Sequence, residues 1–209
     1  MRTILQINTS LFGEGGQSSQ LATRFASALA ARTGAELIVR DFARDPVPHL
    51  DAQRFGAFVA KPPERTSEQN ATVAYSDLLI DELRRADTIV LGLPFYNFGV
   101  PSTLKAYFDH VARAGVTFRY TATGPEGLLK GKRVYVFATR GGNYVGTPLD
   151  TQTSYVRDFL AFLGLSDIQF VYAEGLGISE ASRQIALDHA RNAVDALVHA
   201  DTRTEREAA

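Results

Sequence analysis

Short apolar runs alternate with longer amphipathic stretches along the whole chain. Five of these runs have the length and composition of β-strands, and several carry few polar residues. Such runs are typical of strands that are covered on both faces of a sheet. The predicted strands are Thr3–Asn8, Glu36–Phe42, Asp87–Leu93, Arg133–Thr139 and Asp167–Ala173.

Between and after these strands the apolar residues recur at helical spacing. The predicted helices are Ser18–Arg32, Glu68–Arg85, Ser102–Arg113, Gln152–Leu163 and Glu180–His199. Thr66 and Gln69 have the spacing of a capping box, and Gly34 and Gly164 stand where C-terminal caps are expected. This alternation predicts an α/β fold with a doubly wound, five-stranded parallel sheet and helices on both faces.

Two stretches interrupt the alternation. Asp45–Arg65 is a Pro-containing connector of mixed polarity, and Val116–Lys132 contains a β-type run followed by a Gly124-Pro125 turn. Long loops within compact domains are often functional. No internal repeat is visible, so we expect one domain over residues 1–200 and a polar, frayed tail over 201–209.

The composition is that of an ordinary globular protein, with 45% hydrophobic residues, 22% charged residues and a net charge of −1. A chain so close to neutral lacks the basic footprint of a nucleic-acid-binding protein. There are no cysteines, and the four histidines have no metal-ligand spacing, so no metal site is expected.

No membrane segment or secretory signal is expected. The first eight residues are too short and too polar for a signal peptide, and the richest apolar run, Thr88–Phe95, is far too short to span a bilayer. The sequence therefore predicts a cytoplasmic protein.

The loop after the first predicted strand has the features of an anion site. Ser10, Ser18 and Ser19 offer hydroxyl groups, and backbone N–H groups converge where the helix begins. No Lys or Arg stands between Thr3 and Leu21, which argues against a Walker P-loop. A monophosphate held by hydroxyl and amide groups alone is how flavodoxins bind FMN.

Two other interpretations of this loop remain open. Residues 13–18 match a dinucleotide-binding G-x-G-x-x-G pattern until Ser18, and Asp41 stands near the position of a ribose-binding acid. Alternatively, the stretch is a polar, Gly-rich turn in which a Ser caps the helix.

The loop after the third strand contains three aromatic residues around one amide. Phe95, Tyr96 and Phe98 flank Asn97, between Pro94 and Pro101. Open α/β sheets bind ligands outside the carboxyl ends of their strands. Aromatic surface suits a tricyclic isoalloxazine, while Asn97 offers both a donor and an acceptor. A plug over the end of the sheet is the alternative interpretation.

The fourth strand ends in Thr139-Arg140-Gly141-Gly142. Paired glycines let the backbone approach a flat ligand closely, and their N–H groups would suit the pyrimidine edge of a flavin. Arg140 is interpreted as an electrostatic helper or as a solvated loop charge. Taken alone, such an Arg-Gly-Gly stretch is more often a simple turn.

These loops, in this order, resemble the FMN-dependent NADH-azoreductase family, whose members also reduce quinones. The resemblance covers residues 1–200. It is most specific at Pro94–Phe98, Pro101–Lys105 and Ala112–Tyr120, with support from Gly124–Leu128 and Thr139–Gly142. It implies a flavodoxin-like fold, a homodimer with one FMN per subunit, NADH or NADPH as electron donor, and ping-pong reduction of quinones and azo compounds.

The resemblance also assigns roles to residues. Ser10, Gly16, Gln17 and Ser18 are expected to bind the FMN phosphate. Two further loops are expected to surround the isoalloxazine, and these are Pro94, Phe95, Tyr96, Asn97 and Phe98 together with Thr139, Arg140, Gly141 and Gly142. Phe98, Tyr120 and Phe162 are expected to line the substrate pocket, with Phe162 contributed by the other subunit. No side chain is expected to be catalytic, because the flavin carries the chemistry.

Three positions depart from the family pattern. Gly16 and Thr139 stand where Ser is frequent, and Phe95 stands where Met is frequent. Gly16 removes one hydroxyl from the phosphate loop, and Phe95 is expected to change the shape of the pocket and with it the substrate preference. Two rival functions are a flavodoxin-type electron carrier, which is commonly more acidic than this chain, and a Rossmann NAD-dependent dehydrogenase.

Overall fold

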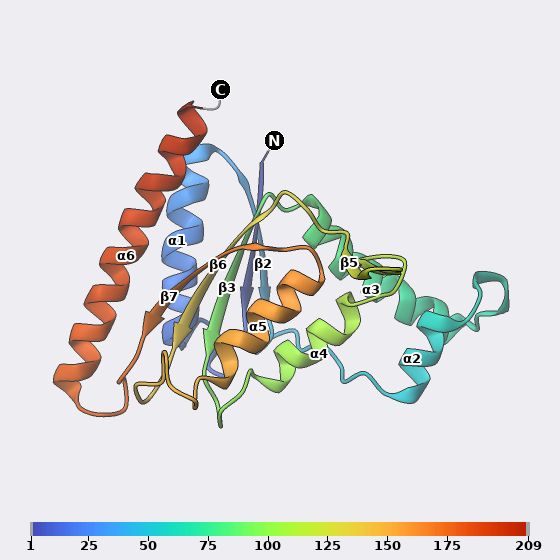
Figure 1. The fold of residues 1–209 in the computed structure, drawn as a ribbon, viewed down its shortest axis with the longest axis horizontal. Helices are drawn as coiled ribbons and strands as arrows, with labels where there is room; N and C mark the ends of the chain where they lie inside the picture. Colours follow the sequence, from blue (N-terminus) through green and yellow to red (C-terminus); the bar gives the residue numbers. More distant parts are fainter. Residues whose placement is uncertain (1, 208–209) are drawn as a thin grey trace.

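Five parallel strands form the centre of the molecule. The computed structural model describes residues 2–207 of the backbone and the side chains of residues 2–200. The sheet has the order β2-β1-β3-β6-β7 (Figure 1). Its strands are β1 Thr3–Asn8, β2 Glu36–Asp41, β3 Thr88–Pro94, β6 Arg133–Thr139 and β7 Asp167–Ala173. The predicted doubly wound parallel sheet is therefore confirmed, with strand ends shifted by at most one residue.

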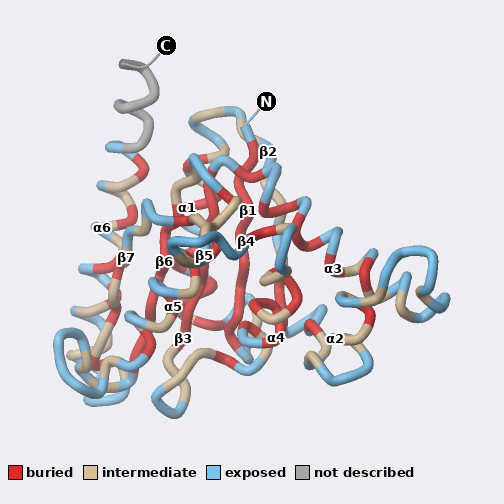
Figure 2. The backbone as a smooth tube through the Cα atoms, turned by 45° about the vertical axis from the view of Figure 1, so that its right-hand side comes forward, coloured by how far each residue is buried: buried red, intermediate tan, exposed pale blue. Residues whose placement is uncertain are grey.

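Helices cover both faces of this sheet (Figure 1). On one face lie α1 Gln17–Thr33 and α6 Glu180–Glu207, and on the other lie α3 Ser67–Arg85, α4 Ser102–Val111 and α5 Thr151–Phe162. Each helical layer buries its own apolar cluster against the sheet. Figure 2 shows the result, a sheet whose central strands β1, β3 and β6 are buried between helices with exposed outer surfaces.

The strand order locates the ligand-binding edge. With the strands of the small hairpin set aside, the order reads 2-1-3-4-5, which is the flavodoxin-like order with its switch point between the first and third strands. A Rossmann sheet would carry a further parallel strand beyond the second, and β2 is the edge strand here. The Rossmann alternative is therefore wrong for this fold.

Both interruptions of the alternation contain structure that the sequence pattern did not predict. Residues 45–65 include α2 Ala52–Val59, whose N-terminus is capped by Asp51, and a short 3₁₀ helix, η2 Pro62–Glu64. α2 has only eight residues, which is too short for a helical period to be recognised in the sequence. Another short 3₁₀ helix, η1 Gly13–Gly15, lies in the loop after β1.

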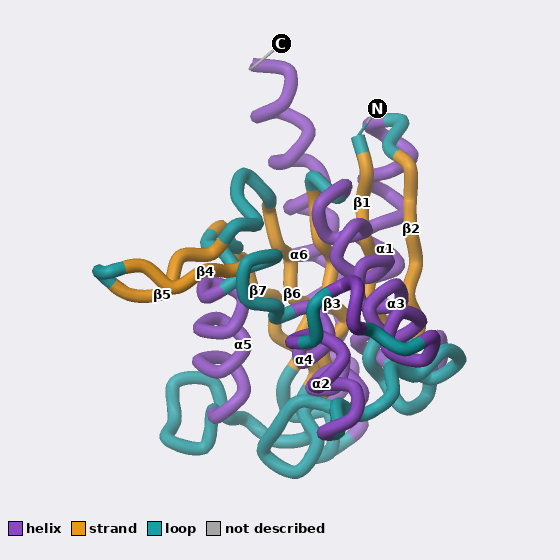
Figure 3. Tube along the Cα trace, turned by 90° about the vertical axis from the view of Figure 1, so that its right-hand side faces the viewer, coloured by secondary structure: helices purple, strands orange, loops and turns teal. Residues whose placement is uncertain are grey.

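The second interruption is a hairpin of β4 Phe118–Thr121 and β5 Gly124–Gly127. The predicted turn at Gly124-Pro125 is wrong, because these residues pair with Thr121 and Tyr120 in the first half of β5. A proline is tolerated there because a two-stranded ribbon consists of edge strands. In Figure 3 the hairpin stands out from the body of the molecule, beside one end of α5.

Helix ends agree closely with their sequence signals. The Thr66–Gln69 capping box is present at α3, and Gly34 ends α1 in the left-handed conformation. The last helix continues past the predicted end at His199 to Glu207. The side chains of the tail predicted to be frayed, residues 201–209, lie outside the described residues, and so does the backbone of residues 208–209. Across the part of the chain that the structure describes, no helix is both long and apolar enough to cross a membrane.

Candidate functional site

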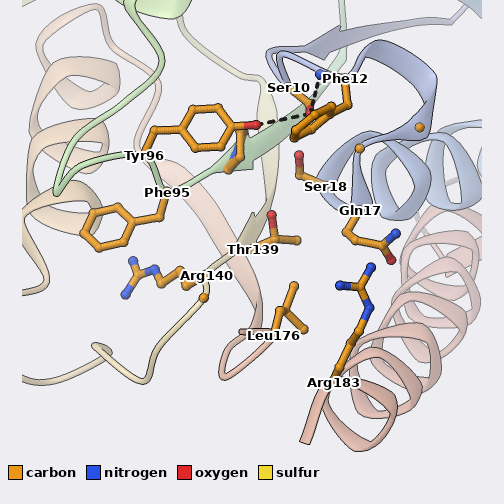
Figure 4. A pocket seen from close by; sticks show the side chains of 14 residues that line it. Ser10, Phe12, Gln17, Ser18, Phe95, Tyr96, Thr139, Arg140, Leu176 and Arg183 are labelled. Atoms are coloured by element: carbon orange, nitrogen blue, oxygen red, sulfur yellow. Dashed lines mark hydrogen bonds between the residues drawn. The ribbon is translucent and has the colours of Figure 1, made fainter. Parts of the chain in front are cut away.

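The loops that follow β1, β3 and β6 meet in one cleft at the carboxyl end of the sheet (Figure 4). It lies at the switch point, where Asn8 of β1 is paired with Gly92 of β3 and Pro94 of β3 with Thr139 of β6. Ten of the predicted cofactor-binding residues line this cleft: Ser10, Gly16, Gln17, Ser18, Pro94, Phe95, Tyr96, Thr139, Arg140 and Gly141. The structure thus brings together three segments far apart in sequence.

The start of α1 presents free hydrogen-bond donors to the cleft. The helix begins at Gln17, and its N-cap, Gly16, has no side chain that could accept from the first amides. The first N–H groups of a helix have no intrahelical acceptor, and the helix dipole adds a partial positive charge. The Ser18 hydroxyl is fully buried and has no hydrogen-bond partner among the described residues. This end of the cleft is suited to an anion.

Ser10 occupies the space beside Gly16. A Cβ placed on Gly16 would stand 2.1 Å from the Ser10 Oγ, so the two side chains compete for one volume. In its present position the Ser10 Oγ accepts a hydrogen bond from the Phe12 N–H at 3.2 Å and lies 3.4 Å from the Tyr96 hydroxyl. The absence of a side chain at Gly16 therefore leaves room for the Ser10 hydroxyl, which links the loop after β1 to the loop after β3.

Three aromatic rings gather at the other end of the cleft. The ring centroids of Phe95, Phe98 and Tyr144 lie 5.2–5.9 Å apart, all in edge-to-face contact. Edge-to-face packing holds such rings in fixed orientations. Phe98 remains 52% exposed, so the cluster offers apolar surface beside the cleft rather than plugging the sheet.

The loop after β3 turns sharply at Asn97 and Phe98. Their φ angles are 48° and 61°, in the left-handed region that non-glycine residues rarely adopt. Tyr96 and Gly99 exchange backbone hydrogen bonds across the turn, which is the geometry of a type I′ hairpin. Strained residues of this kind persist where the surrounding structure holds them, and they concentrate at functional sites.

Gln152 of α5 holds the loop after β3 in place through two hydrogen bonds. Its side-chain amide is completely buried and donates to the carbonyl oxygens of Pro94 and Gly99, at 2.9 and 3.0 Å. The adjacent Thr151 hydroxyl donates to the Phe98 carbonyl. The first turn of α5 thus fixes both ends of the strained loop, a role that the sequence pattern did not reveal.

Arg140 is a buried structural cation, so its interpretation as a solvated loop charge is wrong. Its side chain is fully buried and forms ion pairs with Asp150 at 2.8 Å and Glu174 at 3.3 Å. The guanidinium carbon lies 5.0 Å from the ring centroids of both Phe95 and Tyr172. A sequence window around Arg140 cannot show this, because its partners lie at the N-cap of α5 and after β7.

The carboxylates of Glu174 and Asp150, which pair with Arg140, also bond to neighbouring residues of the site. Glu174 accepts hydrogen bonds from the N–H groups of Tyr144 and Val145, at 2.8 and 3.0 Å, and thereby shapes the loop after β6. Burial alone would raise the pKa of Asp150, but hydrogen bonds from Arg140 and Thr153 outweigh it and lower that pKa. Asp150 therefore stays ionised as a partner for Arg140.

Gly141 and Gly142 differ in their surroundings. A Cβ on Gly141 would meet no atom within 4 Å, whereas one on Gly142 would stand 2.9 Å from the Tyr144 ring. Open space in front of Gly141, a lining residue, is room for a ligand to approach the backbone. Tyr144 lies over Gly142 and covers it.

Two predicted pocket residues lie away from the cleft of their own chain. Tyr120 is on the projecting hairpin and is 76% exposed. Phe162 is at the far end of α5, with its ring centroid 4.3 Å from that of Phe118. Ten residues separate it from Gln152, which corresponds to about 15 Å along the helix.

Two lining residues outside the predicted loops come from the segment after β7. Leu176 and Arg183 reach the cleft, Arg183 from the first turn of α6 (Figure 4). Their segment was predicted as a loop and a helix, but no sequence signal places it beside the first strand. Among the described residues, no group of three or more potential metal ligands is close enough to hold an ion.

Comparison with known proteins gives consistent results for the family and the fold. A family model for the flavodoxin-like fold matches residues 2–198. An FMN-dependent NADH:quinone oxidoreductase of Cellvibrio japonicus is 56% identical over 187 residues, covering 89% of this chain and 94% of that protein. FMN-dependent NADH:quinone oxidoreductase 6 of Burkholderia lata is 53% identical and covers 94% of this chain and all of that protein.

Solved structures show the same similarity in three dimensions. The FMN-dependent NADH-azoreductase of Bacillus anthracis, crystallised in complex with FMN, superimposes with a TM-score of 0.83 at 27% identity. The alignment covers 95% of this chain and all of that one. The azoreductase AzrA superimposes with a TM-score of 0.80 at 25% identity, covering 92% and 98% of the two chains.

Proposed function

Because this chain belongs to the flavodoxin-like family of FMN-dependent NADH:quinone oxidoreductases, we propose that it binds FMN in the cleft and transfers electrons from NADH to quinones. The observation that carries the proposal is the meeting of the three strand-end loops at the switch point. An anion site and an aromatic surface lie at opposite ends of that cleft, as a flavin mononucleotide requires.

The residues present fit FMN. The orphaned Ser18 hydroxyl, the free amides at the start of α1 and the Ser10 hydroxyl would hold the phosphate. The open space before Gly141 would admit the edge of the ring system. Asn97, in its left-handed turn, would offer its amide to the same edge.

When bound, FMN supplies the hydride chemistry, accepting two electrons from a reduced nicotinamide and delivering them to a second molecule. The chain's own contribution is positioning. The rings of Phe95, Phe98 and Tyr144 meet edge-to-face and provide an apolar surface beside the cleft, against which a planar molecule can pack. Donor and acceptor would use this surface in turn, which predicts ping-pong kinetics.

Buried ion pairs would keep this surface rigid. Arg140 contacts the Phe95 ring, while Glu174 holds the backbone of Tyr144. Both therefore act as positioning residues that fix the aromatic rings relative to the loop glycines. Backbone N–H groups of Gly141 and Gly142 would stabilise negative charge at the edge of the ring system, as oriented donors do in a low-dielectric site.

The finer points of the proposal rest on the resemblance to the family. They are one FMN per subunit, a homodimer, the use of NADPH as well as NADH, and the reduction of azo compounds. Tyr120 and Phe162 lie too far from their own cleft to line it, which is consistent with a contribution to the cleft of a second subunit. A cytoplasmic location remains a prediction from the sequence.

Flavin identification combined with kinetics tests the proposal. The purified protein should release FMN and not FAD when heated, and the bound flavin should be bleached by NADH. Quinone reduction should give parallel double-reciprocal plots, the signature of a ping-pong mechanism. An electron carrier of the flavodoxin type would bind FMN but would not oxidise NADH, and that result would contradict the proposed activity.

A further inference from the structure

Two cationic side chains line the cleft, Arg140 and Arg183, and only the first is neutralised by other described residues. Arg140 is paired with Asp150 and Glu174. The guanidinium of Arg183 has no hydrogen-bond or ion-pair partner among residues 2–200, the part whose side chains are described. It is half-buried at the mouth of the cleft. An unpaired cation facing a ligand cleft requires an explanation.

The neighbouring arginines on the same side of the sheet are paired. Arg24 of α1 forms a two-bond ion pair with Asp195 of α6, at 2.7 and 2.8 Å. Arg191, eight residues beyond Arg183 on the same helix, contacts Asp188 at 2.9 Å. The free charge of Arg183 is thus a local feature of the cleft rather than a general property of this surface.

The backbone before Arg183 is fixed to the site. Residues 175–177 donate three backbone hydrogen bonds to the carbonyl oxygens of residues 140–142, at distances of 2.8–3.1 Å. Ser179 caps the start of α6 by accepting from the Ser182 N–H, and the Ser182 hydroxyl donates to the Gly175 carbonyl. The first turn of α6 is therefore held in place against the loop that follows β6.

From this turn the Arg183 side chain extends toward Gln17, at the start of α1 (Figure 4). The uncapped amides of α1 and the orphaned Ser18 hydroxyl face the same space. The loop after β1 contains no cation of its own, since no Lys or Arg stands between Thr3 and Leu21. A phosphate there would meet only neutral donors from its own loop.

We propose that Arg183 is the cationic ligand of the FMN phosphate, supplied by α6 to the site formed by α1. The inference rests on the proposed function, since it names a ligand for the cofactor of that site. A phosphate monoester is doubly charged near neutral pH, and the planar guanidinium binds phosphate oxygens through directed, charge-assisted hydrogen bonds. The sequence predicted a phosphate held by hydroxyl and amide groups alone, and the guanidinium of Arg183 is added to these ligands.

Paired titrations of the flavin-free full-length protein with FMN and with riboflavin test the inference. Riboflavin lacks the phosphate, so its affinity measures every contact of the flavin except those made by the phosphate. Arg183→Ala should bind FMN about tenfold or more weakly than the wild type, because hydrogen bonds to charged groups are strong. Riboflavin affinity should be unchanged. Arg183→Lys should recover part of the loss, and added salt should weaken FMN binding more in the wild type than in Arg183→Ala.

Arg191→Ala is the matched control, because it removes the same charge from the same helix away from the cleft. It should leave both affinities at the wild-type values. An Arg183→Ala variant with the wild-type ratio of FMN to riboflavin affinity would overturn the inference. The inference would also be overturned if Arg183→Ala kept the wild-type ratio of FMN to riboflavin affinity but had a raised KM for NADH. Arg183 would then bind the phosphates of the dinucleotide. A wild type that binds FMN no better than riboflavin would instead contradict the phosphate site of the proposed function.

Discussion

Gly127 and Gly164 lie in direct backbone contact where β5 crosses the end of α5. A Cβ on Gly127 would stand 2.0 Å from the Gly164 nitrogen and 2.2 Å from the Leu163 carbonyl carbon. Just beyond this point the Leu129 N–H donates to the Leu163 carbonyl at 2.9 Å. This contact fixes the hairpin to α5 immediately beside Phe162.

We expect Gly127→Ala to destabilise the fold, because backbone atoms rather than a movable side chain occupy the space. Overpacking of this kind costs about 1–3 kcal/mol. Gly56→Ala is the control, since a Cβ there meets nothing within 4 Å in the middle of α2, and it should stabilise by about 0.5–1 kcal/mol. Urea denaturation of both variants measures the two effects. Equal effects of the same sign would show that the close contact does not govern the hairpin.

Asn97 combines a strained backbone with a side chain that we expect to contact the flavin. Its φ of 48° favours Asn or Gly over Ala. Asn97→Gly should keep the turn while removing the amide, and should weaken FMN binding by about 1 kcal/mol, as for one lost hydrogen bond. Asn97→Ala should lose the same affinity and also lower the melting temperature of the flavin-free protein. If Asn97→Gly binds FMN like the wild type, Asn97 serves only the turn.

His110 should make the stability of the protein fall in mild acid. Its ring is buried, lies edge-to-face with Phe58 and Tyr75, and has an Nε2 without a partner among the described residues. Burial lowers the pKa of His110 below its ordinary value near 6.5. The unfolded chain therefore binds this proton at a higher pH than the folded one does.

The sign of the effect follows from proton linkage. Above about pH 6.5 the histidine is neutral in both states, and no penalty exists. As the pH falls below that value, the free energy of unfolding should drop by at most about 1.4 kcal/mol per pH unit. In His110→Phe, which keeps an aromatic ring there, this part of the slope between pH 7.5 and 5.5 should be absent. Identical slopes in the two proteins would contradict the assignment.

The sheet was predictable because each of its strands can be recognised from its own local sequence. Thr3–Asn8 and Arg133–Thr139 coincide with β1 and β6, since buried parallel strands are nearly continuous apolar runs. Asp167–Ala173 coincides with β7, an edge strand whose residues are only partly buried. The three loops of the cleft were predictable for the same reason. Parallel strands place their carboxyl ends at one edge, so residues that follow them must meet there.

The parts that could not be predicted depend on contacts between distant segments. Arg140 looks like a loop charge until Asp150 and Glu174 are seen to surround it. Arg183 belongs to an ordinary helical stretch, and only the packing of α6 beside α1 brings it to the cleft. The helix α2 is only eight residues long, too short to show a period, so its Asp51 cap was the clearest local signal.

The last prediction concerns Phe162 and the second subunit. Phe162 packs against Phe118 of the hairpin and is only partly buried, and it lies about 15 Å along α5 from Gln152, which holds the loop beside the cleft. If it forms part of the pocket, that pocket must belong to a neighbouring chain. Phe162→Ala should then raise the KM for quinones severalfold while FMN content stays at the wild-type level. Phe159→Ala, which removes a ring stacked 4.0 Å from Phe108, should mainly lower stability.

A mixing experiment separates a shared pocket from an indirect effect. Gly141→Val should abolish FMN binding in its own chain, because the side chain would fill open space in the cleft, yet that chain still carries an intact Phe162. When equal amounts of Gly141→Val and Phe162→Ala chains are refolded together, half of the dimers should be mixed. Each mixed dimer would contain one complete site, so about a quarter of the sites should show wild-type kinetics. If the mixture is no more active than the sum of the two separate variants, or if size exclusion gives an active monomer, the pocket is complete within one chain.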